Sequence, residues 1–131
     1  DCLAVDAASA RLLTAFGVDR FFEATASVDV LLVNADEARA LTGLDPEEAA
    51  VALARRYRIA CVKLGRDGAL AATGEDVLRA EVQALDCVDT LGAGDAFAGG
   101  LLYSLSRGVE LGVALRAGCD AATAALLSRG R

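Results

Sequence analysis

Residues 89–97, DTLGAGDAF, have the residue types and the spacing that transfer of a phosphoryl group would need. Gly92, Ala93 and Gly94 stand where a strand is expected to lead into a helix. Free backbone N–H groups and the helix dipole make such a start a site for an anion. Asp95 follows directly, and the same dipole favours its charged form, so that it is available to accept a proton. An anion site beside a base suits transfer of a phosphoryl group to a hydroxyl. Taken alone, so short a pattern is more often just a glycine-rich helix start with a capping Asp.

Composition excludes several other kinds of function. The chain has 131 residues, with 13 basic and 19 acidic side chains and a net charge of −6. This charge argues against a nucleic-acid backbone or an anionic membrane as the main partner. The chain contains no His, which excludes a Ser-His-Asp triad and every His-ligated metal site. An apolar fraction of 55% excludes a disordered chain and is ample for a buried core.

The cysteines indicate a reducing compartment. They are Cys2, Cys61, Cys87 and Cys119. No two of them form a CxxC pair, so a zinc knuckle or a thioredoxin-like motif is not supported. We expect four reduced thiols that behave as small apolar residues in a cytoplasmic protein. No signal peptide is visible, and Arg116 and Asp120 interrupt the longest apolar stretch, so no membrane span is expected.

Short apolar runs alternate with segments of helical period, which predicts an α/β fold with a mainly parallel sheet. An antiparallel patch at one edge is indicated by a hairpin turn at 66–68. The expected strands are 2–5, 28–33, 59–64, 69–73 and 77–82, and the expected helices are 11–16, 35–42, 46–57, 92–107 and 110–128.

Two of these helices have clear start signals. Asn34 is expected to cap a helix that ends at Thr42, with Gly43 as its stop. Asp45 is expected to cap the next helix, with Glu48 three residues later completing a capping box.

Three segments together resemble one family. Residues 89–97 resemble the DTxGAGD signature of the ribokinase-like, or PfkB, family of carbohydrate kinases. Residues 34–37 (NADE) resemble its NxxE motif, and residues 62–69 (VKLGRDGA) resemble its TxGxxG turn, in the family's order. The resemblance covers essentially the whole chain but only the C-terminal half of the family. It implies a ribokinase-like three-layer α/β/α sandwich that lacks the N-terminal half and the lid, so we treat residues 1–131 as a single domain or a fragment.

The resemblance assigns catalytic roles to matching positions. Asp95 matches the base that takes the proton from the sugar hydroxyl, and the glycine-rich turn before it matches the anion hole. Asn34 and Glu37 match residues that organise the phosphates and the hydration shell of Mg²⁺. An outer-sphere Glu agrees with the tendency of Mg²⁺ to keep several waters.

Further positions match the nucleotide site. Gly65 and Gly68 match the turn that packs against the nucleotide. Lys63 replaces the Thr of the family pattern and could act as a point charge on a phosphate. Gly118 and Cys119, which we place around the start of the last helix, fall where the family lines the adenine pocket. A core thiol explains Cys119 equally well.

A monovalent-cation site is found in many members of the family. Asp89 and the backbone near Leu91 and Gly130 match parts of it, with K⁺ as the candidate ion.

The resemblance implies an ATP- and Mg²⁺-dependent kinase that phosphorylates a hydroxyl of a small sugar or nucleoside. This chain would be its nucleotide-binding, catalytic-base half, inactive by itself, and the full-length protein would be a candidate homodimer. The alternative is a truncated, non-catalytic nucleotide-binding remnant of such a kinase. A vitamin-precursor kinase is disfavoured, because those relatives typically carry Cys in place of the final Asp of GAGD.

Overall fold

The computed structural model describes residues 3–7, 10–74, 76–80 and 91–129. The side chains of residues 91–95 and 126–129 are outside the described part, as is the whole of Asp89. The chain divides into two compact units. The first unit is Asp1–Leu64 with Leu70–Leu78, and the second is Gly65–Ala69 with Arg79–Arg131.

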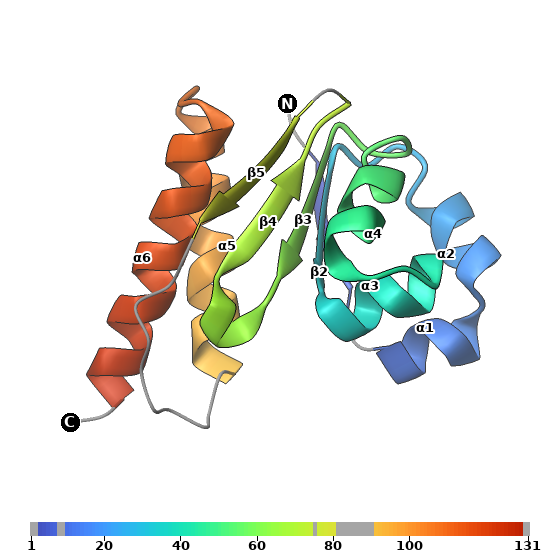
Figure 1. The fold of residues 1–131 in the computed structure, drawn as a ribbon, viewed down its shortest axis with the longest axis horizontal. Coiled ribbons are helices and arrows are strands. Elements are labelled where there is room, and N and C mark those ends of the chain that lie inside the picture. The colour runs from blue at the N-terminus through green and yellow to red at the C-terminus, as the bar shows by residue number, and fades with distance from the viewer. Residues whose placement is uncertain (1–2, 8–9, 75, 81–90, 130–131) are drawn as a thin grey trace. The chain divides into compact units, whose positions relative to one another are not determined.

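The strands form one sheet in the order β1-β2-β3-β4-β5 (Figure 1). β1 (Ala4–Asp6), β2 (Val30–Asn34) and β3 (Ile59–Lys63) pair in parallel. β4 (Ala69–Ala72) and β5 (Val77–Ala80) are drawn as arrows of opposite direction. The sheet is therefore mixed, and the sequence prediction of an α/β fold with an antiparallel patch is confirmed.

The turn between β3 and β4, which are neighbours in the sheet, lies where the hairpin turn was expected. Residues Gly65–Asp67 form a 3₁₀ turn, in which the N–H of Gly68 donates to the carbonyl of Gly65 at 3.2 Å. Gly65 has a φ of +63° and Gly68 a φ of +93°. Both values lie where side chains with a Cβ are disfavoured, which explains the two glycines.

Four helices of the first unit are described: α1 (Ala10–Phe16), α2 (Val18–Ala24), α3 (Ala35–Thr42) and α4 (Pro46–Leu53). The sequence did not predict α2. Gly17, expected only as the stop of α1, has a φ of +104° and also forms the N-cap of α2. A single glycine with a positive φ thus turns the chain from one short helix into another.

These helices pack on one face of the parallel strands. Leu31 and Val33 of β2, with Ala60 and Val62 of β3, project into a core cluster with apolar residues of the helices. Because side chains alternate along a strand, Val30 and Leu32 project to the other face, where they are also buried. The cluster consists of Ala7, Leu13, Leu31, Val33, Ala38, Leu41, Ala49, Ala50, Leu53, Ala54, Tyr57, Ala60, Val62, Leu70 and Ala72.

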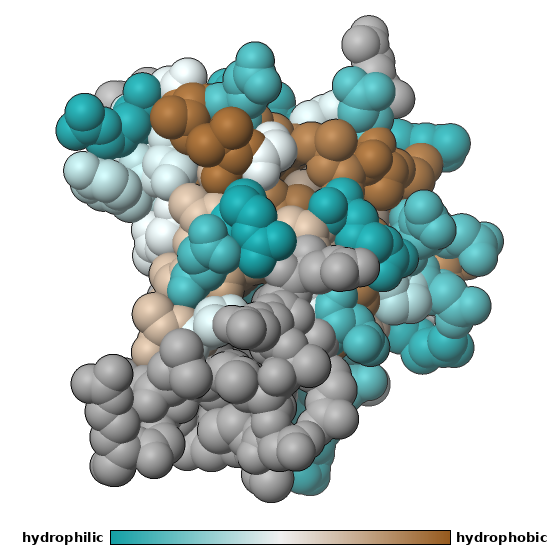
Figure 2. Space-filling model, turned by 60° about the vertical axis from the view of Figure 1, so that its left-hand side comes forward, coloured by the Kyte–Doolittle hydropathy of each residue, from teal (hydrophilic) through white to brown (hydrophobic). Residues whose placement is uncertain are grey.

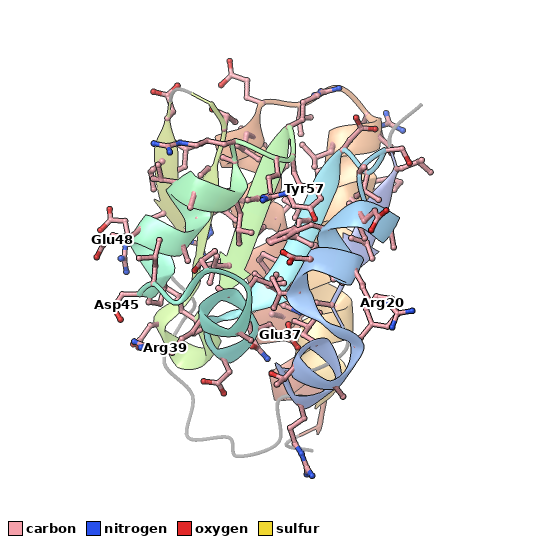
Figure 3. The ribbon with its side chains drawn as sticks, turned by 90° about the vertical axis from the view of Figure 1, so that its right-hand side faces the viewer. Arg20, Glu37, Arg39, Asp45, Glu48 and Tyr57 are labelled. Carbon is pink, nitrogen blue, oxygen red and sulfur yellow. The ribbon has the colours of Figure 1, made fainter. Side chains whose placement is uncertain are left out.

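The caps of α3 and α4 differ. Asn34 forms the expected capping box, and Gly43 ends α3 in the left-handed conformation with a φ of +75°. Asp45 precedes α4 but makes no capping bond through its side chain, so the predicted capping box with Glu48 is wrong. The carboxylate of Asp45 pairs instead with Arg39, beside it at the surface in Figure 3.

α4 also ends at Leu53, before the expected Tyr57. The chain turns there, because the backbone N–H groups of Arg56 and Tyr57 both donate to the carbonyl of Leu53.

The second unit contains α5 (Leu91–Ser106) and α6 (Leu111–Arg129), close to their predicted bounds. Gly108, with a φ of +79°, lies in the turn between them. Exposed apolar side chains of this unit include Tyr103, Val109 and Val113. Figure 2 shows hydrophobic patches separated by hydrophilic side chains on the face that it presents. In the described part of the chain, no helix is both long and apolar enough to cross a membrane.

Candidate functional site

Two of the predicted motifs meet at the carboxyl ends of neighbouring strands. Asn34 is the last residue of β2 and Lys63 the last residue of β3, and the two are partners in the parallel register. Residues in register on parallel strands share a face, and neighbouring strands are about 4.8 Å apart. Asn34 and Lys63 therefore lie side by side at the edge of an α/β sheet where ligands usually bind.

Glu37 is fixed beside this pair by hydrogen bonds. Its backbone N–H donates to Oδ1 of Asn34 at 2.7 Å, and its Oε1 accepts from the backbone N–H of Asn34 at 2.9 Å. Glu37, in the first turn of α3, is only 3% exposed and is labelled in Figure 3. The motif is thus both a capping box and a means of fixing a carboxylate at the sheet's carboxyl edge.

The side-chain oxygen atoms of this motif suit Mg²⁺ as outer-sphere ligands, which contact the ion through its bound water. A carboxylate and an amide supply the hard oxygens that Mg²⁺ prefers. The burial of Glu37 and its bond to the backbone favour contact through a water over direct coordination. Within the described residues, no group of three or more His, Cys, Asp or Glu side chains could hold a metal ion.

The turn after Lys63 leaves room for a ligand. A Cβ built on Gly65 would meet no atom within 4 Å, so only its positive φ requires glycine there. Gly68 is buried and also has a positive φ. The backbone at Gly65 is accordingly open to close approach by another molecule.

The glycine-rich motif lies where the sequence analysis placed it. Gly92, Ala93, Gly94 and Asp95 are the second to fifth residues of α5, which begins at Leu91. The first four N–H groups of a helix have no partner within it, so this turn has the backbone arrangement of an anion site.

Gly118 and Cys119 lie deeper in α6 than expected. They are in the third turn of a helix that begins at Leu111, and both are buried. Burial raises the pKa of Cys119, with a smaller lowering by Arg116 and a smaller raising by Asp120. Its Sγ lies 3.8 Å from the carbonyl oxygen of Ala80. The burial and the raised pKa indicate a protonated thiol in a core position. An adenine contact of Cys119 stays a prediction.

Within the first unit, the structure brings together Asn34, Glu37 and Lys63. Within the second, it places residues 92–95 on α5 and Gly118 on the neighbouring α6. The sequence analysis missed Phe97, whose ring and carbonyl pack against Gly118. The sequence shows an aromatic residue two positions after Asp95. It does not show that this residue packs against Gly118 of α6.

Comparisons with known proteins agree with the family resemblance. A family model described as pfkB family carbohydrate kinase matches residues 9–131. The ATP-dependent 6-phosphofructokinase of Thermoanaerobacterium thermosaccharolyticum is 35% identical over 100 residues, covering 70% of this chain and 31% of that protein.

Solved structures share the fold. A probable sugar kinase from Rhizobium etli CFN 42 has a TM-score of 0.86 and 28% identity, over 96% of this chain and 39% of that one. Aminoimidazole riboside kinase from Salmonella enterica, solved with aminoimidazole riboside and an ATP analog, has a TM-score of 0.80 and 29% identity, over 95% of this chain and 46% of that one. The expected ribokinase-like α/β fold is confirmed, and this chain spans less than half the length of these relatives.

Proposed function

Because the chain belongs to the pfkB family of carbohydrate kinases, we propose that it is the nucleotide-binding and catalytic-base part of an ATP-dependent kinase. The acceptor would be a hydroxyl of a small sugar or nucleoside, the substrate classes named for its relatives. The observation that carries the proposal is the position of residues 92–95 in the first turns of α5, which combines an anion site with a carboxylate.

In the proposed reaction, Asp95 accepts the proton of the attacking hydroxyl. The hydroxyl oxygen forms a bond to the γ-phosphorus of ATP, the bond to the bridging oxygen breaks, and ADP leaves with that electron pair. The N–H groups at the start of α5 stabilise the charge on the transferred group. Both functions would then lie on one helix, because these N–H groups and Asp95 are close in the sequence.

Residues at the carboxyl ends of β2 and β3 would bind the nucleotide phosphates. Lys63, half-buried at the end of β3, would add positive charge beside Asn34. Glu37 and Asn34 would orient the water shell of Mg²⁺, which supplies charge neutralisation when bound. Gly65 and Gly68 would let the backbone approach the nucleotide, while Asp89, outside the described residues, remains the candidate for a K⁺ site.

The test is an assay of ADP formation with Mg²⁺-ATP and a panel of sugars, sugar phosphates and nucleosides. It uses the polypeptide that carries this chain together with a sugar-binding half. We expect Asp95→Asn to lower kcat by about 10²–10⁴-fold, because a general base is lost, while ATP affinity stays within a few-fold. Asp120→Asn, an exposed carboxylate of α6, is the matched control and should keep its activity.

Near-wild-type turnover by Asp95→Asn would contradict the assignment of the base. ATP binding without phosphorylation of any acceptor on the panel would favour a non-catalytic remnant. The 131-residue chain by itself is expected to form no ADP above background, since most of the positioning of the acceptor would be missing.

A further inference from the structure

α5 and α6 approach each other through two glycines, one on each helix. A Cβ built on Gly100 of α5 would lie 2.8 Å from the carbonyl oxygen of Ala117. A Cβ built on Gly118 of α6 would lie 2.9 Å from Cε1 of Phe97 and 3.0 Å from the carbonyl oxygen of Phe97. Real Cβ atoms essentially never approach other atoms this closely, so a methyl group added at either glycine would force a neighbouring group to shift.

The surroundings of Gly118 leave little room for adjustment. Phe97 is 4% exposed, and Leu101 and Leu115 are fully buried within the same unit. Cys119, the next residue of α6, contacts the carbonyl of Ala80 through its thiol. A methyl group at Gly118 would therefore have to displace Phe97 or shift α5 itself, because dense packing resists extra volume.

Phe97 connects this contact to the chemistry. It lies two residues after Asp95 on the same helix, and its carbonyl belongs to the backbone that carries residues 92–95. Displacing Phe97 would thus move the first turns of α5.

We propose that Gly118 is a positioning residue, whose contact with Phe97 sets the place of Asp95 and of the anion-binding N–H groups. This inference rests on the proposed function and differs from the adenine contact that the family resemblance implies for Gly118. An adenine contact would affect ATP binding, whereas a positioning role acts on the base. A misplacement of about 1 Å can lower the rate about 10²-fold.

The experiment measures kcat, the KM for ATP and the Kd of a non-hydrolysable ATP analogue in the complete kinase. We expect Gly118→Ala to lower kcat about 10²-fold, with the Kd of the analogue within about threefold of wild type. Gly99→Ala, on α5, is the control, because a Cβ built there would meet no neighbouring atom within 4 Å. Its kcat should equal that of wild type.

A second substitution, at Phe97, tests whether the activity lost in Gly118→Ala can be restored. Phe97→Leu removes the ring atoms nearest to Gly118, and by itself it should lower kcat only a few-fold. The double variant Gly118→Ala with Phe97→Leu should recover kcat to within a few-fold of Phe97→Leu, because the ring is gone and only the carbonyl oxygen of residue 97, at 3.0 Å, then stays close to the added methyl. Should Gly118→Ala alone fail to fold, the double variant against Phe97→Leu still tests the contact. A double variant tenfold slower than Phe97→Leu would overturn the proposal.

A raised KM for ATP at unchanged kcat in Gly118→Ala would also overturn it and would favour the adenine contact. Failure of the proposed function is a separate result. In that case wild type forms no ADP, or Asp95→Asn keeps full turnover, whatever Gly118→Ala does.

Discussion

The two units of this chain fix their candidate functional groups by different means. In the first unit, side chains fix the candidate groups, since Asn34 and Glu37 are joined by two reciprocal hydrogen bonds between side chain and backbone. In the second unit, the candidate groups include backbone N–H groups of α5, and its helices contact each other at glycines. Replacing a polar side chain with a smaller one removes individual hydrogen bonds and creates no steric clash. A methyl group added at a glycine contact between helices forces neighbouring atoms to shift, so the second unit should be the less tolerant of small substitutions.

The largest expected effect on stability comes from the glycine contact in α5. Gly100→Ala should lower the free energy of unfolding by about 1–3 kcal/mol, because its methyl would overlap the carbonyl of Ala117. Gly99→Ala, one residue away in open space, should instead raise it by up to about 1 kcal/mol through helix propensity. Urea unfolding of the two variants checks the difference. Equal stabilities would show that α5 and α6 adjust freely, and the contrast between the units would fail.

A smaller effect is expected at the capping box of the first unit. Asn34→Ala should lower the free energy of unfolding by about 1 kcal/mol, because it removes the acceptor for the N–H of Glu37. Asp45→Ala is its control at the start of α4, where the side chain makes no capping bond. Its ion pair with Arg39 is well exposed, so we expect a loss below about 0.5 kcal/mol. Thermal unfolding of both variants measures the difference, and a larger loss for Asp45→Ala would reverse our assignment of the caps.

The smallest effect is expected at Tyr57, another side-chain contact of the first unit. Its hydroxyl lies 2.6 Å from Oγ1 of Thr25. Thr25 also donates to the carbonyl of Phe21, so Tyr57→Phe leaves it with a partner. The loss at neutral pH should be about 1 kcal/mol or less.

The pH dependence of this variant sharpens the test. Burial raises the pKa of Tyr57 above 10.0, although Thr25 and Arg56 each lower it somewhat. The folded state therefore binds the phenolic proton more tightly than the unfolded state does. The stability from this difference is present below about pH 10 and is lost as the pH rises through the folded pKa. Wild type should thus lose stability above pH 10 more steeply than Tyr57→Phe, and parallel curves would contradict this.

The sequence by itself determined those features that depend on contacts between near neighbours. The bonds between Asn34 and Glu37 span three residues, and Gly43 ends α3 through a conformation that glycine alone adopts readily. Apolar runs predicted the strands, and the order of three motifs indicated the family that the comparisons show. These signals are local, so they can be recognised before any packing is known.

Tertiary structure decided what depends on segments distant in the chain. The pairing of Asn34 with Lys63 comes from the register of two strands, which no local pattern fixes. Two other differences are local: Arg39, six residues before Asp45, pairs with its carboxylate in place of the predicted cap, and Gly17 leads directly into a second helix. The glycine requirement at Gly118 exists because Phe97 lies against it on another helix. Steric exclusion depends on the distance between two backbones, and only the packing of α5 on α6 sets that distance.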